Sequence, residues 1–232
     1  MTHTNTLWTR LTALSFAIAG ICFALYPAIR PFTDESTLQG AEAFASPAWL
    51  LAHSSAMVGF ILLTLGLLGL YSQFRETTAG RLGMTALVVI WIGVGLTLPY
   101  YGAETFALRA VGQEALRQNN VDLLVTITNS FRLGAGAWFF GPGLLAIAVG
   151  AILFAIAIWR SGVLTKWSGI PLAVGLALFL PQFYTSPPVR IGHGLLVAVG
   201  CWVIAWSMLS HRTAVDSARL GNRLGLPSTS VK

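Results

Sequence analysis

Charged side chains are scarce in this chain. Only 9% of its 232 residues are Asp, Glu, Lys or Arg, whereas soluble domains contain about 25%. Hydrophobic residues make up 55% of the sequence, and the mean hydropathy is +0.72. This composition excludes a soluble globular protein and indicates an integral membrane protein in contact with a lipid bilayer.

The chain also lacks the short motifs that mark common cofactor and nucleotide sites. It contains no HxxxH, HExxH or CxxC spacing, and no phosphate loop, Rossmann fingerprint or serine-nucleophile elbow in a suitable context. Its two cysteines, Cys22 and Cys201, lie inside apolar runs, where packing is their ordinary role. The net charge of +6 does not indicate nucleic-acid binding, because the basic residues fall at the ends of apolar runs.

Apolar runs of spanning length predict an all-α, polytopic bundle of six transmembrane helices. Each run approaches the roughly 20 residues that a helix needs to cross a bilayer, and none alternates as a barrel strand does. The runs lie at 11–29, 48–71, 82–103, 135–159, 167–184 and 191–209. We therefore expect a transmembrane domain over 1–210 and a mobile cytoplasmic tail over 211–232.

The distribution of Lys and Arg predicts the orientation. Nine of these residues lie in the N-terminus, the 72–81 and 160–166 loops and the C-terminal tail, and five lie on the other side. The positive-inside rule then places both termini in the cytoplasm, with the protein in the plasma (inner) membrane. On the outer side, the long 105–134 connection is expected to contain a helix that lies on or dips into the membrane surface.

A weak internal repeat suggests three helical hairpins. Each outward helix begins at a base and meets a proline near its outer end. Counting back eighteen residues from the cytoplasmic end of each inward helix gives His53, Gly141 and His193. Membrane folds built from repeats often have their site at the repeat interface.

The stretch Leu98-Pro99-Tyr100-Tyr101-Gly102-Ala103-Glu104 supplies the main site candidate. It places a carboxylate at a membrane boundary, where an unpaired charge is expensive. Tyr100 and Tyr101 lie about one turn earlier on the same helical face. A bend at Pro99 is expected to turn Glu104 inward, towards His193 and at least one of Arg132 and Arg190.

Prolines near the outer helix ends favour a polar pocket there. Pro27, Pro99, Pro142 and Pro181 each remove a helical hydrogen bond and free a carbonyl that needs a new partner. Simple kinks absorbed by neighbouring helices would explain them equally well. The residues expected to build the pocket are His53, Tyr100, Tyr101, Glu104, Arg132, Arg190 and His193.

The two histidines are compatible with more than one cofactor and with none. His53, His193 and Glu104 form a set that suits zinc or non-haem iron, and two histidines alone could hold a haem. The simplest interpretation is that they make local hydrogen bonds and that no cofactor is present. The arginines could bind a carboxylate or phosphate, or could serve charge compensation and lipid contact.

Three functions remain compatible with these residues. The first is binding or transport of a small or amphiphilic ligand. The second is a membrane enzyme acting on a lipid-like substrate, with Glu104, His193 and His53 as catalytic groups and Tyr100, Tyr101, Arg132 and Arg190 as ligand-binding groups. The third is a non-catalytic membrane subunit.

Three stretches carry a resemblance to a known group of proteins. Leu98–Glu104, Leu180-Pro181-Gln182-Phe183 and Val189-Arg190-Ile191-Gly192-His193-Gly194 together resemble small six-helix membrane proteins of bacteria, particularly actinobacteria. The resemblance covers most of the chain. It implies the six-helix fold, and it implies no activity, cofactor or catalytic residue.

Overall fold

The computed structural model describes residues 6–223, with side chains over 6–211. Every regular element in this part of the chain is helical. The α-helices are α1 (Thr6–Ile29), α2 (Leu38–Ala45), α3 (Pro47–Phe74), α4 (Gly80–Gly102), α5 (Leu108–Gln118), α6 (Val121–Arg132), α7 (Ala135–Ser161), α8 (Ile170–Ala177) and α9 (Pro187–Arg223). The all-α class is therefore confirmed.

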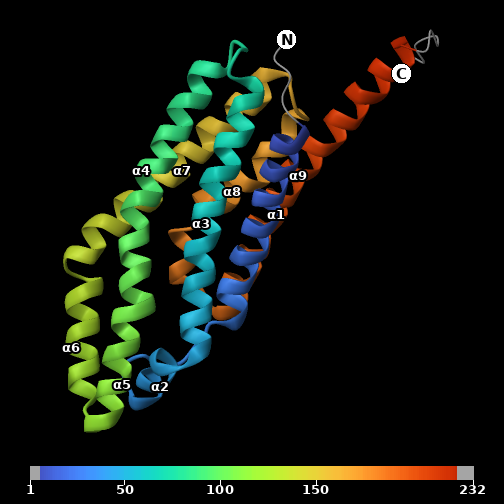
Figure 1. Ribbon diagram of the computed structural model, residues 1–232. Helices are drawn as coiled ribbons and strands as arrows, with labels where there is room; N and C mark the ends of the chain where they lie inside the picture. Colours follow the sequence, from blue (N-terminus) through green and yellow to red (C-terminus); the bar gives the residue numbers. More distant parts are fainter. Residues whose placement is uncertain (1–5, 224–232) are drawn as a thin grey trace.

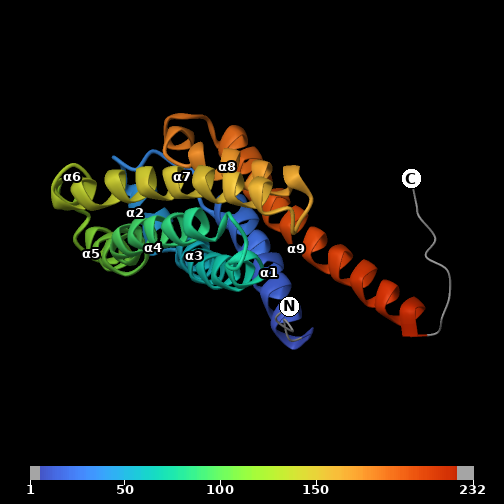
Figure 2. The same ribbon diagram turned by 90° about the horizontal axis from the view of Figure 1, so that it is seen from above.

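Five helices are long and apolar enough to cross a membrane, and they indicate a multi-pass membrane protein. These are α1, α3, α4 with its continuation, α7, and α9 as far as His211. Contacts connect α1 to α3, α3 to α4, α4 to α7, α7 to α8, α8 to α9 and α9 back to α1, so the elements form a closed ring. Figure 2 shows α1, α3 and α4 on one side of this ring and α7 and α8 on the other, with α9 crossing beside α1.

The sixth position in the ring is held by an interrupted segment, not by the continuous helix predicted over 167–184. Short 3₁₀ turns at Lys166–Gly169 and Pro181–Tyr184 flank the two-turn helix α8. Pro181 has no N–H to bond the carbonyl of Ala177, and α8 ends at Ala177. The segment returns the chain between α7 and α9, which run towards the same end of the bundle (Figure 1).

Helix α4 continues beyond the bundle through a π-helical turn, Ala103–Ala107, into α5. The combined rod of 39 residues is about 58 Å long, well over the roughly 30 Å of a hydrocarbon core. Helix α6 returns antiparallel to α5 along the same axis (Figure 1). The connection over 105–134 thus contains two helices that pack against each other, and the prediction that one of them lies on or dips into the membrane surface stays a prediction.

Local signals in the turn between α5 and α6 explain this hairpin. Asn119 ends α5 in the left-handed conformation at φ 49°, which asparagine tolerates better than most residues. The side chain of Asn120 then caps α6 by accepting a hydrogen bond from the N–H of Leu123 at 3.0 Å. A small second core of α2, α3, α5 and α6 residues supports the hairpin, formed by Ala41, Phe44, Trp49, Leu108, Ala115 and Leu124.

The backbones of α4 and α7 approach each other very closely. A Cβ added at Gly93 of α4 would lie 2.7 Å from the carbonyl oxygen of Gly143 and 2.7 Å from the amide nitrogen of Ile147, both in α7. Gly95, two residues later, has open space around its Cα. Small residues allow such contact between helices in a membrane, and this contact fixes the position of α4, which carries the site.

The C-terminal end of α9 differs from the expected boundary of the tail. The helix passes residue 211 without interruption and continues to Arg223. The predicted mobility of the tail stays a prediction, and residues 224–232 lie outside the described part of the chain. The pairing of α1 with α3 and of α4 with α7 fits helical hairpins, while the internal repeat remains a prediction.

Candidate functional site

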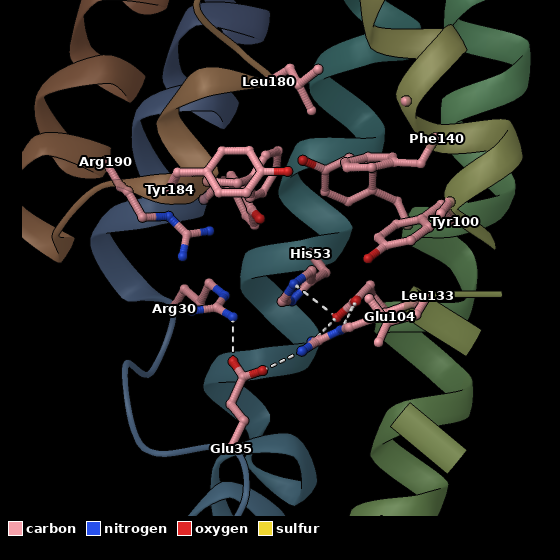
Figure 3. A pocket seen from close by; sticks show the side chains of 16 residues that line it. Arg30, Glu35, His53, Tyr100, Glu104, Leu133, Phe140, Leu180, Tyr184 and Arg190 are labelled. Carbon is pink, nitrogen blue, oxygen red and sulfur yellow. Dashed lines mark hydrogen bonds and ion pairs between the residues drawn. The ribbon is translucent and has the colours of Figure 1, made fainter. Parts of the chain in front are cut away.

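A cavity of about 490 Å³ lies at the end of the bundle where α5 and α6 emerge. Residues from α1, α3, α4, α6, α7, α9, the π-helical turn at Ala103–Ala107 and three connecting segments line it (Figure 3). The lining residues are Tyr26, Arg30, Glu35, His53, Tyr100, Tyr101, Glu104, Arg132, Leu133, Ala137, Phe140, Gly141, Leu180, Phe183, Tyr184 and Arg190. All the pocket residues predicted from the sequence are among them except His193.

The π-helical turn places Glu104 inside the protein. Such turns are rare and often occur at functional sites, because an extra residue in the turn redirects the side chains around it. Glu104 is only 5% exposed, and its backbone carbonyl accepts a hydrogen bond from the indole N–H of Trp49 at 2.6 Å. The predicted inward orientation of Glu104 is confirmed, although α4 runs through Pro99 and the irregular turn follows it.

Arg132, at the end of α6, binds Glu104 through two parallel hydrogen bonds. Its Nε donates to Oε1 at 2.6 Å and its Nη2 to Oε2 at 2.8 Å. The remaining terminal nitrogen, Nη1, donates to Glu35. Glu35 in turn accepts from Nη2 of Arg30 at 2.6 Å. A chain of alternating charges thus joins the ends of α1, α4 and α6 (Figure 3).

The charges in this network keep Glu35 and Arg132 ionised. Burial alone would raise the pKa of Glu35, but the guanidinium groups of Arg132 and Arg30 hold that pKa below its ordinary value. Burial alone would lower the pKa of Arg132, but Glu104 and Glu35 raise it above its ordinary value. Both groups therefore carry their charge at neutral pH.

The lowered pKa of Glu35 predicts a pH-dependent contribution to stability. This contribution is fully present above the ordinary value of 4.5 and is lost as the pH falls through the lower folded-state pKa. We expect Glu35→Gln to lower the unfolding free energy by about 2 kcal/mol at neutral pH, because charge-assisted hydrogen bonds are lost. Thermal unfolding in detergent should show the difference from wild type shrinking below pH 4.5. A difference independent of pH would contradict the assignment.

His53 faces Glu104 from α3. Its Nδ1 lies 3.0 Å from the carbonyl oxygen of Trp49 and so must carry the proton when the ring is neutral. Nε2 then presents a lone pair towards the cavity, 3.9 Å from Oε2 of Glu104. The ring is only 2% exposed; it lies tilted against Trp49 and edge-on to Tyr26. One backbone bond thus fixes which nitrogen of His53 faces a ligand.

His193 does not belong to the cavity, which contradicts its predicted approach to Glu104. Its Nε2 is 2.8 Å from the carbonyl oxygen of Gly175, and its ring lies edge-on to that of Phe179, with ring centroids 5.2 Å apart. The interrupted helix α8 supplies the carbonyl that holds it. Among the described residues, no three His, Cys, Asp or Glu side chains gather to hold a metal ion, so the predicted zinc or iron set is not formed. Because Nε2 of His193 is engaged by the carbonyl of Gly175, this nitrogen does not face His53 as a haem ligand in the structure.

Arg190, on α9, occupies the side of the cavity away from Glu104. Its Nε donates to the side-chain oxygen of Gln182 at 3.1 Å, and its guanidinium lies over the rings of Phe32 and Phe183. Its two terminal nitrogens have no hydrogen-bond or ion-pair partner among the described residues. Figure 3 shows the guanidinium pointing into the cavity above Arg30.

Tyr100 and Tyr101 line the cavity in different ways. Tyr100 stacks on Phe140 of α7 with ring centroids 4.0 Å apart, and its hydroxyl points towards Glu104 (Figure 3). Tyr101 is 1% exposed, and its buried hydroxyl makes no hydrogen bond of good geometry within the described part of the protein. Tyr26 contacts Tyr101 with centroids 5.6 Å apart.

Three residues of the site were not identified from the sequence: Arg30, Glu35 and Tyr26. Glu35 and Arg30 were not named as site candidates, although an acid and a base that follow the end of an apolar run are a usable signal. Tyr26 was not singled out, because an aromatic residue near a helix end is as typical of an aromatic belt as of a cavity wall. Arg109 is outside the site, because its Nη1 bonds the carbonyl of Ser46 at 2.7 Å and holds α5 against the start of α3.

Comparison of the chain with family models, with curated proteins and with solved structures found no match. The class of protein therefore rests on the fold and the site themselves. Five apolar helices define a multi-pass membrane protein, and the charged cavity at one end of its bundle is the candidate site.

Proposed function

We propose that this protein binds an amphiphilic ligand whose anionic head group enters the cavity. The observation that carries the proposal is the state of Arg190, a partly buried cation whose terminal nitrogens face the cavity without a carboxylate partner among the described residues. Partly buried guanidinium groups are stabilised by anions, which they bind through two parallel hydrogen bonds. Arg30 and Arg132 already have such partners, whereas Arg190 has a donor set available for a ligand.

The rest of the wall suits the hydrocarbon part of an amphiphile. Apolar and aromatic side chains form much of the remaining wall, namely Leu133, Phe140, Leu180, Phe183 and Tyr184. Leu133 and Tyr184 are largely exposed, at 78% and 86%. Pockets for small molecules commonly combine such apolar walls with a few placed polar groups.

The distribution of Lys and Arg supports a cavity on the outer side of the plasma membrane. The membrane-spanning parts near the other end contain hardly any ionisable residues. A polar path through the bundle would be needed for proton-driven transport. We therefore favour binding of the ligand over transport coupled to protons.

Replacing Arg190 by glutamine should weaken binding of decanoate about tenfold or more. The reason is that a charge-assisted hydrogen-bonded pair contributes about 1.5–3 kcal/mol. Binding is measured by isothermal titration on the purified full chain in nanodiscs, with decanol and decyltrimethylammonium as uncharged and cationic probes. Arg117→Gln is the matched control, because Arg117 is exposed on α5 and pairs with Glu114. Equal affinity for all three probes, or an equal loss in both variants, would contradict the proposal.

The enzymatic alternative draws on one specific observation, the free Nε2 of His53. With its proton fixed on Nδ1, this nitrogen could act as a base towards a group in the cavity. Glu104 suits an acid–base role less well, since both of its oxygens accept hydrogen bonds from Arg132. Mass spectrometry of the bound probe distinguishes the two functions, because a binding protein returns the amphiphile unchanged.

A further inference from the structure

The charges that line the cavity do not cancel. Three arginines, Arg30, Arg132 and Arg190, face two carboxylates, Glu35 and Glu104. With His53 neutral, three positive charges and two negative charges leave one positive charge. Charge imbalance is expensive in a partly buried site, where the effective dielectric constant is well below that of water. The cavity is therefore complementary to a ligand with a single negative charge.

The unbalanced charge can be assigned to one residue. All three guanidinium nitrogens of Arg132 donate to Glu104 or Glu35. Arg30 donates to Glu35 and, at 3.4 Å, to the carbonyl of Pro31. Only Arg190, of these three, lacks a carboxylate partner within the described chain. Its two terminal nitrogens form a planar pair of donors that matches two oxygens on one atom.

A second donor is buried beside this charge. The hydroxyl of Tyr101 lies close to the side chain of Tyr26 but makes no hydrogen bond of good geometry within the described part of the protein, although Tyr101 is 1% exposed and lines the same cavity as Arg190. Buried hydroxyl groups are nearly always hydrogen-bonded in native proteins, because leaving one unpaired is unfavourable. An oxygen of a ligand would provide the missing partner.

We infer that the head group bound in this cavity is a monoanion with two terminal oxygens on one atom, a carboxylate or a phosphodiester, held by Arg190 and by the hydroxyl of Tyr101. This inference rests on the proposed function and specifies the charge and shape of the head group. A phosphate monoester, which carries nearly two negative charges above its second pKa of about 6, would leave the cavity with a net negative charge. A zwitterionic or cationic head group would leave the charge of Arg190 unbalanced.

The test compares four amphiphiles against the full chain in nanodiscs at mildly alkaline pH. The probes are decanoate, a short-chain phosphatidylglycerol, decyl phosphate and decyltrimethylammonium. We expect decanoate or phosphatidylglycerol to bind at least tenfold more tightly than the other two, and their relative affinity tells whether the source is a free acid or a lipid head group. Tighter binding of decyl phosphate would overturn the inference and leave the proposed anion site standing. Absence of binding by every probe would overturn the proposed function itself.

Tyr101→Phe provides the second arm. Loss of one hydrogen bond should weaken binding of the preferred monoanion about fivefold, while the melting temperature without ligand should stay equal or rise because an unpaired buried hydroxyl is removed. Tyr71 lies near the end of α3 that is far from the cavity. Tyr71→Phe is therefore the matched control and should leave the affinity unchanged. Unchanged affinity of the Tyr101 variant, or a lowered melting temperature without ligand, would show that this hydroxyl serves the fold and would overturn its assignment to the ligand.

Discussion

Replacing Arg132 by glutamine should destabilise the folded protein by about 3–5 kcal/mol, the range measured when one member of a buried ion pair is removed. The side chain of Glu104 is only 6% exposed and that of Arg132 22%. Without Arg132, the carboxylate of Glu104 would stay buried with a neutral partner, and Glu35 would lose one of its two cations. Unfolding of the purified protein by dodecyl sulfate, followed by circular dichroism, measures the change.

A double variant separates the ion pair from simple packing. Glu104→Gln combined with Arg132→Gln removes both charges and leaves two groups that can still hydrogen-bond. This variant should recover part of the stability lost in Arg132→Gln alone. If the two single substitutions were simply additive, the pair would not be coupled and the geometry described for it would be wrong.

Gly93→Leu should lower the unfolding free energy by about 3 kcal/mol or more, because overpacking forces a backbone to move. A Cβ at this position already lies 2.7 Å from backbone atoms of α7, so α4 and α7 would have to separate. Gly95→Leu is a close control on the same helix, since nothing lies within 4 Å of its added Cβ. This variant should stay within about 0.5 kcal/mol of wild type. Similar losses in both variants would rule out the close contact as the cause.

The apolar runs and the charged residues at their ends were sufficient to predict most of the fold and much of the site. Hydropathy placed five of the spans, because a bilayer dictates the length and composition of what crosses it. Glu104, Arg132, Arg190 and His53 were identified because charged or polar groups near hydrocarbon need partners. The sequence shows that these groups need partners, but it does not show which groups lie close enough to pair.

The errors came from local geometry that hydropathy does not record. The run at 167–184 is largely apolar, yet α8 ends at Ala177. The N–H of Phe179 then bonds Leu176 in place of Gly175, and the carbonyl of Gly175 bonds His193. The π-helical turn at 103–107 gives no signal in composition, although it continues α4 into α5 and turns Glu104 towards His53. These two irregular segments determine which groups His193 and Glu104 face.

The charged network also sets an order for biogenesis. Its members are made far apart in time: Arg30 and Glu35 emerge from the ribosome first, Glu104 follows with the third long helix, and Arg132 comes only after the hairpin of α5 and α6 has been translated. Until then the nascent chain holds a carboxylate at the membrane boundary without its cation. The ion pair that completes the network can therefore form only after the first three long helices and the hairpin of α5 and α6 have been synthesised.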